Sequence, residues 1–157
     1  MQILDAWQRL GHRALGRWLF ARAVCWRAPY FATIRPHFHE LRSGRCAVAL
    51  KRRRAVLNHL GSVHAIAIAN LCELAAGVLM EATLPATHRW IPRGMTIEYL
   101  TRAESDVLAT ARLDRNAWGG AENVGVPVTV ADLAGRETVR AVISMYVSPR
   151  AAVASGS

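Results

Sequence analysis

Residues 57–80 read LNHLGSVHAIAIANLCELAAGVLM, and this stretch decides the fold. Its helical part is almost wholly apolar on every side, with one acid, Glu73, in the middle. A helix of this kind is expected to be buried, and an ionised carboxylate is costly to bury without a partner. His64, Asn70 and Glu73 interrupt the run, which favours the core helix of a globular domain over a membrane span. We therefore expect Glu73 to have a specific structural or functional role.

Polar residues gather where this helix is expected to begin. Asn58 and His64 precede Glu73, and Gly61 and Ser62 lie between them. The backbone amides at a helix N-terminus favour negative charge, so the acid, the polar pair and these amides could together form a hydrolytic site. Each residue also has a structural interpretation. Glu73 can pair with an arginine, His64 can bond a backbone carbonyl in the core, and Asn58 can turn the chain before Gly61.

The composition indicates one folded domain. The chain has 157 residues, of which 52% are hydrophobic, too many for a disordered chain. Its three cysteines, Cys25, Cys46 and Cys72, lack the spacing of a disulfide framework or of a CxxC metal motif. No apolar leader is evident either, so we expect a reducing, cytoplasmic setting. His37, His39 and His59 lack supporting acids or cysteines, so no metal site and no cofactor are expected.

The basic residues are concentrated at the start of the chain. Residues 1–54 hold twelve Lys and Arg against two acids, whereas residues 55–157 hold eight against nine. Nucleic acid, an anionic membrane surface, an acidic carrier protein or a phosphorylated ligand could each use such charge. We expect no nucleic-acid binding, because the sequence shows no recognition motif beyond charge. A solvated basic face is the simpler alternative.

The N-terminal segment predicts a single amphipathic helix over residues 3–26. One face carries apolar residues at helical spacing, namely Leu4, Trp7, Ala14, Leu15, Trp18 and Cys25. The opposite face carries Arg9, Arg13 and Arg17. We expect the apolar face to dock on the domain core; a helix lying on a membrane surface is the alternative. The following residues 28–44 are rich in aromatic and turn residues, and we expect them to cover an opening in the fold.

Alternating apolar residues predict strands at 46–50, 95–99, 107–113, 124–130 and 139–147, with a loop over 83–94. The connections between the later strands are too short for crossover helices, so these strands should be antiparallel. One strand, one long helix and four strands predict an α+β fold in which the sheet wraps the helix. We divide the chain into an N-terminal basic helix (1–28), one domain (29–148) and a flexible tail (149–157).

The pattern N-x-x-G-x-V-H-x-x-x-x-x-x-L-x-E resembles the hotdog-fold acyl-CoA thioesterases, most closely the phenylacetate-pathway type and its relatives. It is filled by Asn58, Gly61, Val63, His64, Leu71 and Glu73. The segments MTIEYLTRAESDVLATARL and ADLAGRETVRAVISMYVSP resemble the family's later strands, and the likeness covers roughly residues 30–148. The resemblance implies a hotdog fold, an antiparallel sheet of five or so strands around a long central helix, here with an added N-terminal helix.

The resemblance also implies hydrolysis of an acyl-CoA thioester to a free acid and CoA. Glu73 would activate water or attack the thioester, the Ala65 amide would hold the oxyanion, His64 would lie near the thioester, and Asn58 would position water or substrate. Substrate-binding residues would be Gly61, Ser62, His88, Arg89 and Arg93, with the two arginines near the CoA phosphates. Three positions depart from the family, which usually has Gly in place of Ala65, often has Asp in place of Glu73, and often has Ser or Thr in place of His88.

The family further implies a homodimer or homotetramer with active sites at the subunit interface. The basic N-terminal helix adds the hypothesis of peripheral membrane or acyl-carrier contact. A non-catalytic acyl-CoA or lipid-binding module is the alternative function, favoured by Ala65 and by the basic helix. Cys72 is next to Glu73, but adjacent helical residues point about 100° apart, so we interpret it as a buried structural thiol.

Overall fold

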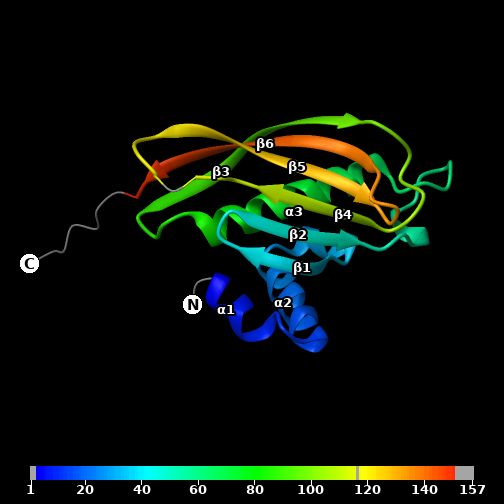
Figure 1. Cartoon of the computed structure of the whole chain (residues 1–157), viewed down its shortest axis with the longest axis horizontal. Helices are drawn as coiled ribbons and strands as arrows, with labels where there is room; N and C mark the ends of the chain where they lie inside the picture. The colour runs from blue at the N-terminus through cyan, green and yellow to red at the C-terminus, as the bar shows by residue number, and fades with distance from the viewer. Residues whose placement is uncertain (1–2, 116, 151–157) are drawn as a thin grey trace, which may run out of the picture.

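The computed structural model describes residues 3–115 and 117–150. Within these residues the chain folds into one antiparallel sheet of six strands that wraps a long helix, α3, with two shorter helices at one edge (Figure 1). The strand order is β1-β2-β4-β5-β6-β3. The elements are α1 (Ile3–Leu10), α2 (Ala14–Arg27), η1 (Pro29–Ile34), β1 (His37–Arg42), β2 (Arg45–Leu50), η2 (Arg54–Val56), α3 (Ala65–Thr83), β3 (His88–Tyr99), β4 (Val107–Arg112), β5 (Glu122–Asp132) and β6 (Glu137–Pro149).

Helix α3 forms the centre of the core. Its side chains pack against the inward-facing residues of the strands, which alternate along β5 as Val124, Val126, Val128 and Val130. Each fully buried aliphatic side chain of this kind contributes about 1.5–3 kcal/mol. By length and composition α3 could cross a membrane, but 61% of its most apolar window is buried inside the fold. It is therefore the core helix that the sequence predicts, and the hotdog fold is confirmed.

The two edges of the sheet differ. At the β1 edge, α1 and α2 lie beyond the strand, and the Phe20 ring of α2 meets the Phe38 ring of β1 edge-on at 5.0 Å (Figure 1). At the other edge, β3 pairs with β6 on one side, and none of the described residues forms a strand along its other side. Unpaired edges invite pairing with another chain.

Two sequence predictions about the sheet are wrong. Residues 28–44 contain a strand, β1, and the predicted loop over 83–94 is largely strand, because β3 begins at His88. Both strands carry an irregularity that breaks the two-residue period, between Phe38 and Glu40 in β1 and between Pro92 and Gly94 in β3. A bulge of this kind moves later side chains to the opposite face, which hides the alternation.

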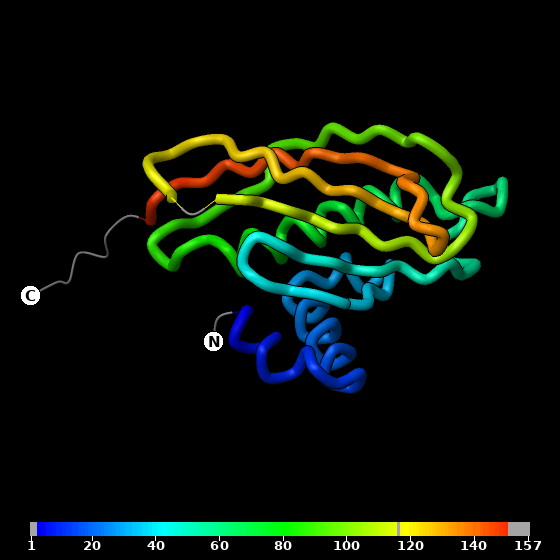
Figure 2. Tube along the Cα trace, viewed as in Figure 1, coloured from blue at the N-terminus to red at the C-terminus, as the bar shows by residue number. Residues whose placement is uncertain are grey.

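The predicted single helix over residues 3–26 is also wrong, because the chain breaks between α1 and α2 (Figure 2). The break lets α1 fold back on α2 at Gly16, where an added Cβ would lie 1.9 Å from the Leu10 carbonyl oxygen. Trp7 then packs at 5.1 Å from the Phe20 ring, so this part of the apolar face does dock on the core. Leu15 and Trp18 do not, since they are 68% and 54% exposed.

Candidate functional site

The N-terminus of α3 is capped by the side chain of His64. The Ile66 amide donates a hydrogen bond of 3.1 Å to His64 Nδ1. This contact gives His64 a capping role, and its place near the thioester stays a prediction. The Ala65 amide is the first in the helix and has no intrahelical acceptor. It lies at the positive end of the helix dipole, as an oxyanion donor requires.

The turn before the helix is built around Asn58. Its Nδ2 donates to Ser62 Oγ at 2.9 Å, and its Oδ1 accepts from the Leu60 and Ser62 amides at 3.0 and 3.2 Å. Gly61 has φ +78°, which favours glycine. The alternative interpretation of Asn58, that it turns the chain before Gly61, therefore describes its contacts. Asn58, Gly61 and Ser62 together position His64 and Ala65.

Glu73 is half-buried on the face of α3 that also carries Ile66 and Gly77. Among the described residues its carboxylate makes no ion pair or hydrogen bond, so the interpretation as an arginine-paired structural acid receives no support. One turn further on, the Trp90 ring of β3 covers Gly77, where an added Cβ would lie 3.1 Å from the ring. Trp90 Nε1 donates to Glu81 Oε1 at 3.1 Å, which holds the ring there.

A single chain does not bring Glu73 to the helix N-terminus. Eight residues separate Ala65 from Glu73, which is an axial rise of about 12 Å. A general base must come within about 3 Å of the proton that it removes, directly or through one water. The Ala65 amide and the Glu73 carboxylate of one chain therefore cannot act together on one carbonyl.

A cavity of about 180 Å³ opens beside the α3 N-terminus, lined by η1, η2, His64 and Asn70. Asn70 is only 7% exposed. Its Nδ2 donates to Thr33 Oγ1 at 3.3 Å, while its Oδ1 is buried and has no hydrogen-bond partner among the described residues. Asn70 was not among the predicted site residues, although its polar side chain interrupts the same apolar run as Glu73 and was the available signal.

The residues predicted near the CoA phosphates lie on β3, where their side chains make local contacts. His88 Nε2 donates to the Gly119 carbonyl at 2.9 Å, and its Nδ1 lies 2.9 Å from Thr87 Oγ1. Arg89 Nε donates to Ser148 Oγ at 3.3 Å. The guanidinium of Arg93 lies 4.4 Å from the centroid of the Tyr146 ring. The beginning of β3 lies beside the second half of α3, so one chain does not bring these residues to His64.

Two further residues near the first half of α3 are structural. Cys72 is fully buried, and burial raises the pKa of its thiol to about 12, which supports its interpretation as a structural thiol. The Tyr99 hydroxyl at the end of β3 donates to the Ala65 carbonyl at 3.2 Å. Burial, followed by the neighbouring Cys72, raises the pKa of Tyr99 above its usual range. Tyr99 therefore remains a hydrogen-bond donor that ties β3 to the first turn of α3.

Comparison with solved structures gives the fold independently. A crystal structure from a structural genomics programme is 44% identical to this chain, with a TM-score of 0.82 and coverage of 95% of this chain and 97% of the other. A protein of unknown function from Pseudomonas aeruginosa, described as a probable thioesterase, is 19% identical, with a TM-score of 0.73 and coverage of 81% and 91%. A thioesterase family protein from Silicibacter pomeroyi is 17% identical, with a TM-score of 0.70 and coverage of 83% and 96%.

No curated protein matches the chain. A family model does, over residues 16–147, and its description is "Domain of unknown function (DUF4442)". This match takes in α3, most of α2 and the sheet except the last two residues of β6. The hotdog fold that the resemblance implied is shared with the structures above. The chain belongs to the DUF4442 family.

Proposed function

We propose that this protein hydrolyses an acyl-CoA thioester and that each active site is formed by two copies of the chain. The observation that carries the proposal is a half-buried carboxylate, Glu73, without a partner among the described residues. It lies on a central helix whose first amide, that of Ala65, has no acceptor among the described residues either. Proteins with the same fold from Pseudomonas aeruginosa and Silicibacter pomeroyi, named as a probable thioesterase and a thioesterase family protein, support the reaction class.

The chemistry uses the two groups in different steps. The Ala65 amide donates to the thioester carbonyl and stabilises the negative charge that develops on its oxygen. Glu73 of the other copy removes a proton from water as the water attacks the carbonyl carbon. The tetrahedral intermediate then collapses, the carbon–sulfur bond breaks, and the proton passes from Glu73 to the leaving thiolate. Direct attack by Glu73, followed by hydrolysis of the anhydride, is the alternative route.

The arrangement of β3 on α3 supports a shared site. Trp90, near the start of β3, packs on Gly77 in the second half of α3. Tyr99, at the end of β3, donates a hydrogen bond to the Ala65 carbonyl in the first turn of α3, so β3 runs antiparallel to α3. Two copies related by a two-fold axis would pair their free β3 edges in antiparallel fashion. The beginning of one β3 would then lie opposite the end of the other. This pairing would bring the start of one α3 past the middle of the other α3, where Glu73 lies.

The same pairing would account for the substrate-binding prediction. Arg89 and Arg93 lie near the beginning of β3 and are exposed. In a two-fold pair they would approach the end of the other copy's β3, and hence its Ala65. Arginines at this position could hold the phosphates of CoA while the thioester reaches the helix N-terminus.

The proposal is tested by Glu73→Gln and by mixing inactive variants. Glu73→Gln should lower kcat by orders of magnitude in a free-thiol release assay, with unchanged folding and acyl-CoA binding. Ala65→Val should also be nearly inactive. Co-refolding the two variants should restore about a quarter of wild-type activity, because half of the pairs are mixed and each has one intact site. An unchanged kcat for Glu73→Gln would exclude the acid, and no recovery on mixing would exclude the shared site.

A non-catalytic acyl-CoA or lipid-binding module is the second candidate. The methyl group of Ala65 favours it, because it narrows the space beside the proposed oxyanion amide. The two functions are separated by a panel of acyl-CoA chain lengths. Binding across the panel without thiol release would support the module, whereas release at any chain length supports the enzyme.

A further inference from the structure

The outward side of α2 carries an unusual set of exposed apolar residues. Leu15, Trp18, Leu19 and Trp26 are 68%, 54%, 44% and 84% exposed. Their spacing places them on one side of the helix, with Arg22 among them. The opposite side is committed to the core through its buried residues Gly16, Phe20, Ala21 and Cys25. The apolar outward stripe is therefore not needed for folding.

The stripe lies in a strongly basic part of the chain. Six arginines and no acid occur between Asp5 and Glu40. The guanidinium of Arg22 lies 5.9 Å from the centroid of the Trp18 ring, so charge and aromatic surface are presented together. Within the described residues, none of the recorded ion pairs involves an arginine of α2.

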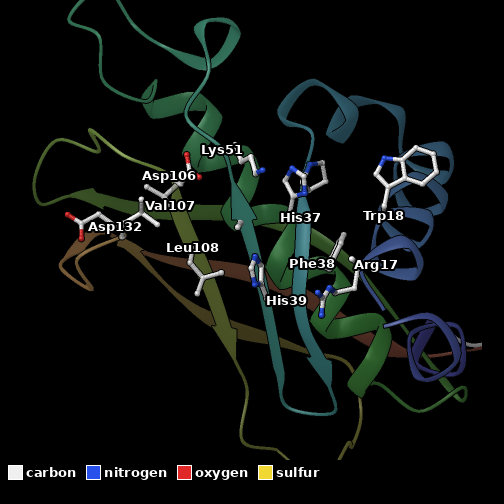
Figure 3. A pocket seen from close by; sticks show the side chains of 14 residues that line it. Arg17, Trp18, His37, Phe38, His39, Lys51, Asp106, Val107, Leu108 and Asp132 are labelled. Carbon is white, nitrogen blue, oxygen red and sulfur yellow. The ribbon is translucent and has the colours of Figure 1, made fainter. Parts of the chain in front are cut away.

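A groove of about 550 Å³ lies beside α2. Arg17 and Trp18 line it from α2, and His37, His39 and Lys51 line it from β1 and the end of β2 (Figure 3). Burial, and then the nearby Lys51 and His39, lower the pKa of His37, while Asp106 opposes this shift. Arg17 and Lys51 therefore supply the permanent positive charge of the groove. Trp18 belongs to both the groove and the stripe.

The two acids at the groove are already engaged by backbone groups. Asp106 Oδ1 accepts a hydrogen bond of 2.8 Å from the Arg52 amide. Asp132 accepts the Ala134 and Arg136 amides at 3.0 and 2.9 Å and holds the turn between β5 and β6. Asp132 also pairs with Arg136 at 3.0 Å. The groove itself therefore holds as many carboxylates as permanent bases. The positive charge of this surface comes from the arginines of α2, which have no ion-pair partner among the described residues and favour an anionic occupant.

We propose that the outward side of α2 docks the protein on an anionic membrane surface. Tryptophan and leucine side chains enter the headgroup region of a bilayer, while arginines beside them contact lipid phosphates. From Leu15 to Trp26 the stripe runs about 16 Å along the helix, so it can lie flat on a planar surface. A second copy of the chain would fit poorly here, because it would bring arginines against arginines. Charge complementarity thus selects the membrane.

The test is co-sedimentation of the full chain with vesicles. One set contains phosphatidylcholine only, and the other contains equal parts of phosphatidylcholine and phosphatidylglycerol. We expect binding to the second set only, decreasing as salt is added. Arg22→Glu changes the charge by two units and should weaken binding by about thirtyfold, since each unit of charge near the surface changes binding about fivefold. The double variant Trp18→Ala, Trp26→Ala should weaken it by on the order of tenfold.

Arg112→Glu is the matched control, because it makes the same charge change on an exposed residue at the far end of β4. It should bind the vesicles like the wild type. Thermal melting and thioester hydrolysis in solution should be unchanged in the Trp18 and Trp26 variant, since both residues are exposed and lie outside the proposed active site. Absence of wild-type binding to the anionic vesicles, or equal loss in Arg112→Glu, would overturn the proposal. Salt-sensitive binding to an acidic carrier protein, without vesicle binding, would do so too.

Discussion

Replacing Asn70 with leucine should make the protein more stable and less active. The two side chains are similar in size, and Asn70 is 7% exposed with its Oδ1 unpartnered among the described residues. A buried polar atom without a partner costs about 1–3 kcal/mol, whereas the lost 3.3 Å bond to Thr33 is worth about 0.5–1.5 kcal/mol. Thr33 Oγ1 keeps its 2.7 Å bond to the Tyr30 carbonyl. We therefore expect a net gain of about 1 kcal/mol, or about 2–8 °C in Tm.

The assay pairs urea unfolding with thioester hydrolysis. If the Asn70 oxygen binds a substrate group in the cavity, Asn70→Leu should lower kcat/KM by about tenfold, which corresponds to about 1.4 kcal/mol. Asn123→Leu is the control, because Asn123 is exposed on β5, and it should leave both quantities nearly unchanged. If Asn70→Leu lowered the free energy of unfolding by more than about 1 kcal/mol, Oδ1 would have to be hydrogen-bonded in solution, and the reasoning would be refuted.

Three further changes test other parts of the molecule. Ala65→Gly should keep or broaden thioester hydrolysis, because the proposed donor is a backbone amide, whereas Ala65→Val should lower kcat/KM more than it lowers stability; wild-type kcat/KM in the valine variant would place the substrate elsewhere. Gly16→Ala should destabilise the fold by about 1–3 kcal/mol in urea, since its Cβ would meet the Leu10 carbonyl at 1.9 Å, while Gly120→Ala, with no atom within 4 Å, should change stability by less than about 0.5 kcal/mol. Cys72 should react with a thiol reagent only after unfolding. Burial raises the pKa of the folded Cys72 thiol to about 12, whereas the thiol of the unfolded chain has a pKa of about 8.5. The stability that the buried thiol contributes should therefore be lost as the pH rises above about 8.5. Fast labelling of the native thiol would contradict both statements.

Periodicity predicted the parts of the fold whose burial follows one regular rule. Helix α3 and the centres of β4, β5 and β6 are buried in unbroken patterns, and each was found close to its predicted place. The start of β3 and the whole of β1 escaped, because irregular pairing interrupts the period. The break between α1 and α2 escaped because its cause is the contact of Gly16 with the Leu10 backbone, which no local pattern displays.

The residues of the proposed site could be selected from the sequence, whereas their contacts could not. The polar residues before α3 and the acid within it stand out from an apolar background, which is why Asn58, His64 and Glu73 could be selected. Their partners could not be, since the hydrogen bonds of Asn58 to Ser62 and of His64 to Ile66 depend on the folded turn. The axial distance of about 12 Å between Ala65 and Glu73 is the reason for proposing a site shared by two chains, which the family resemblance also implies.

The difference between the two edges of the sheet limits how far the protein can polymerise. A sheet with two open edges can add copies without end, as fibrils do. Here α1 and α2 lie beyond β1, so a copy arriving at that side meets helices rather than a strand (Figure 1). We therefore expect growth of the sheet at β3, where one pairing uses the open edge of both copies. The N-terminal helices would then block addition at β1 and limit edge-to-edge growth of the sheet to two copies.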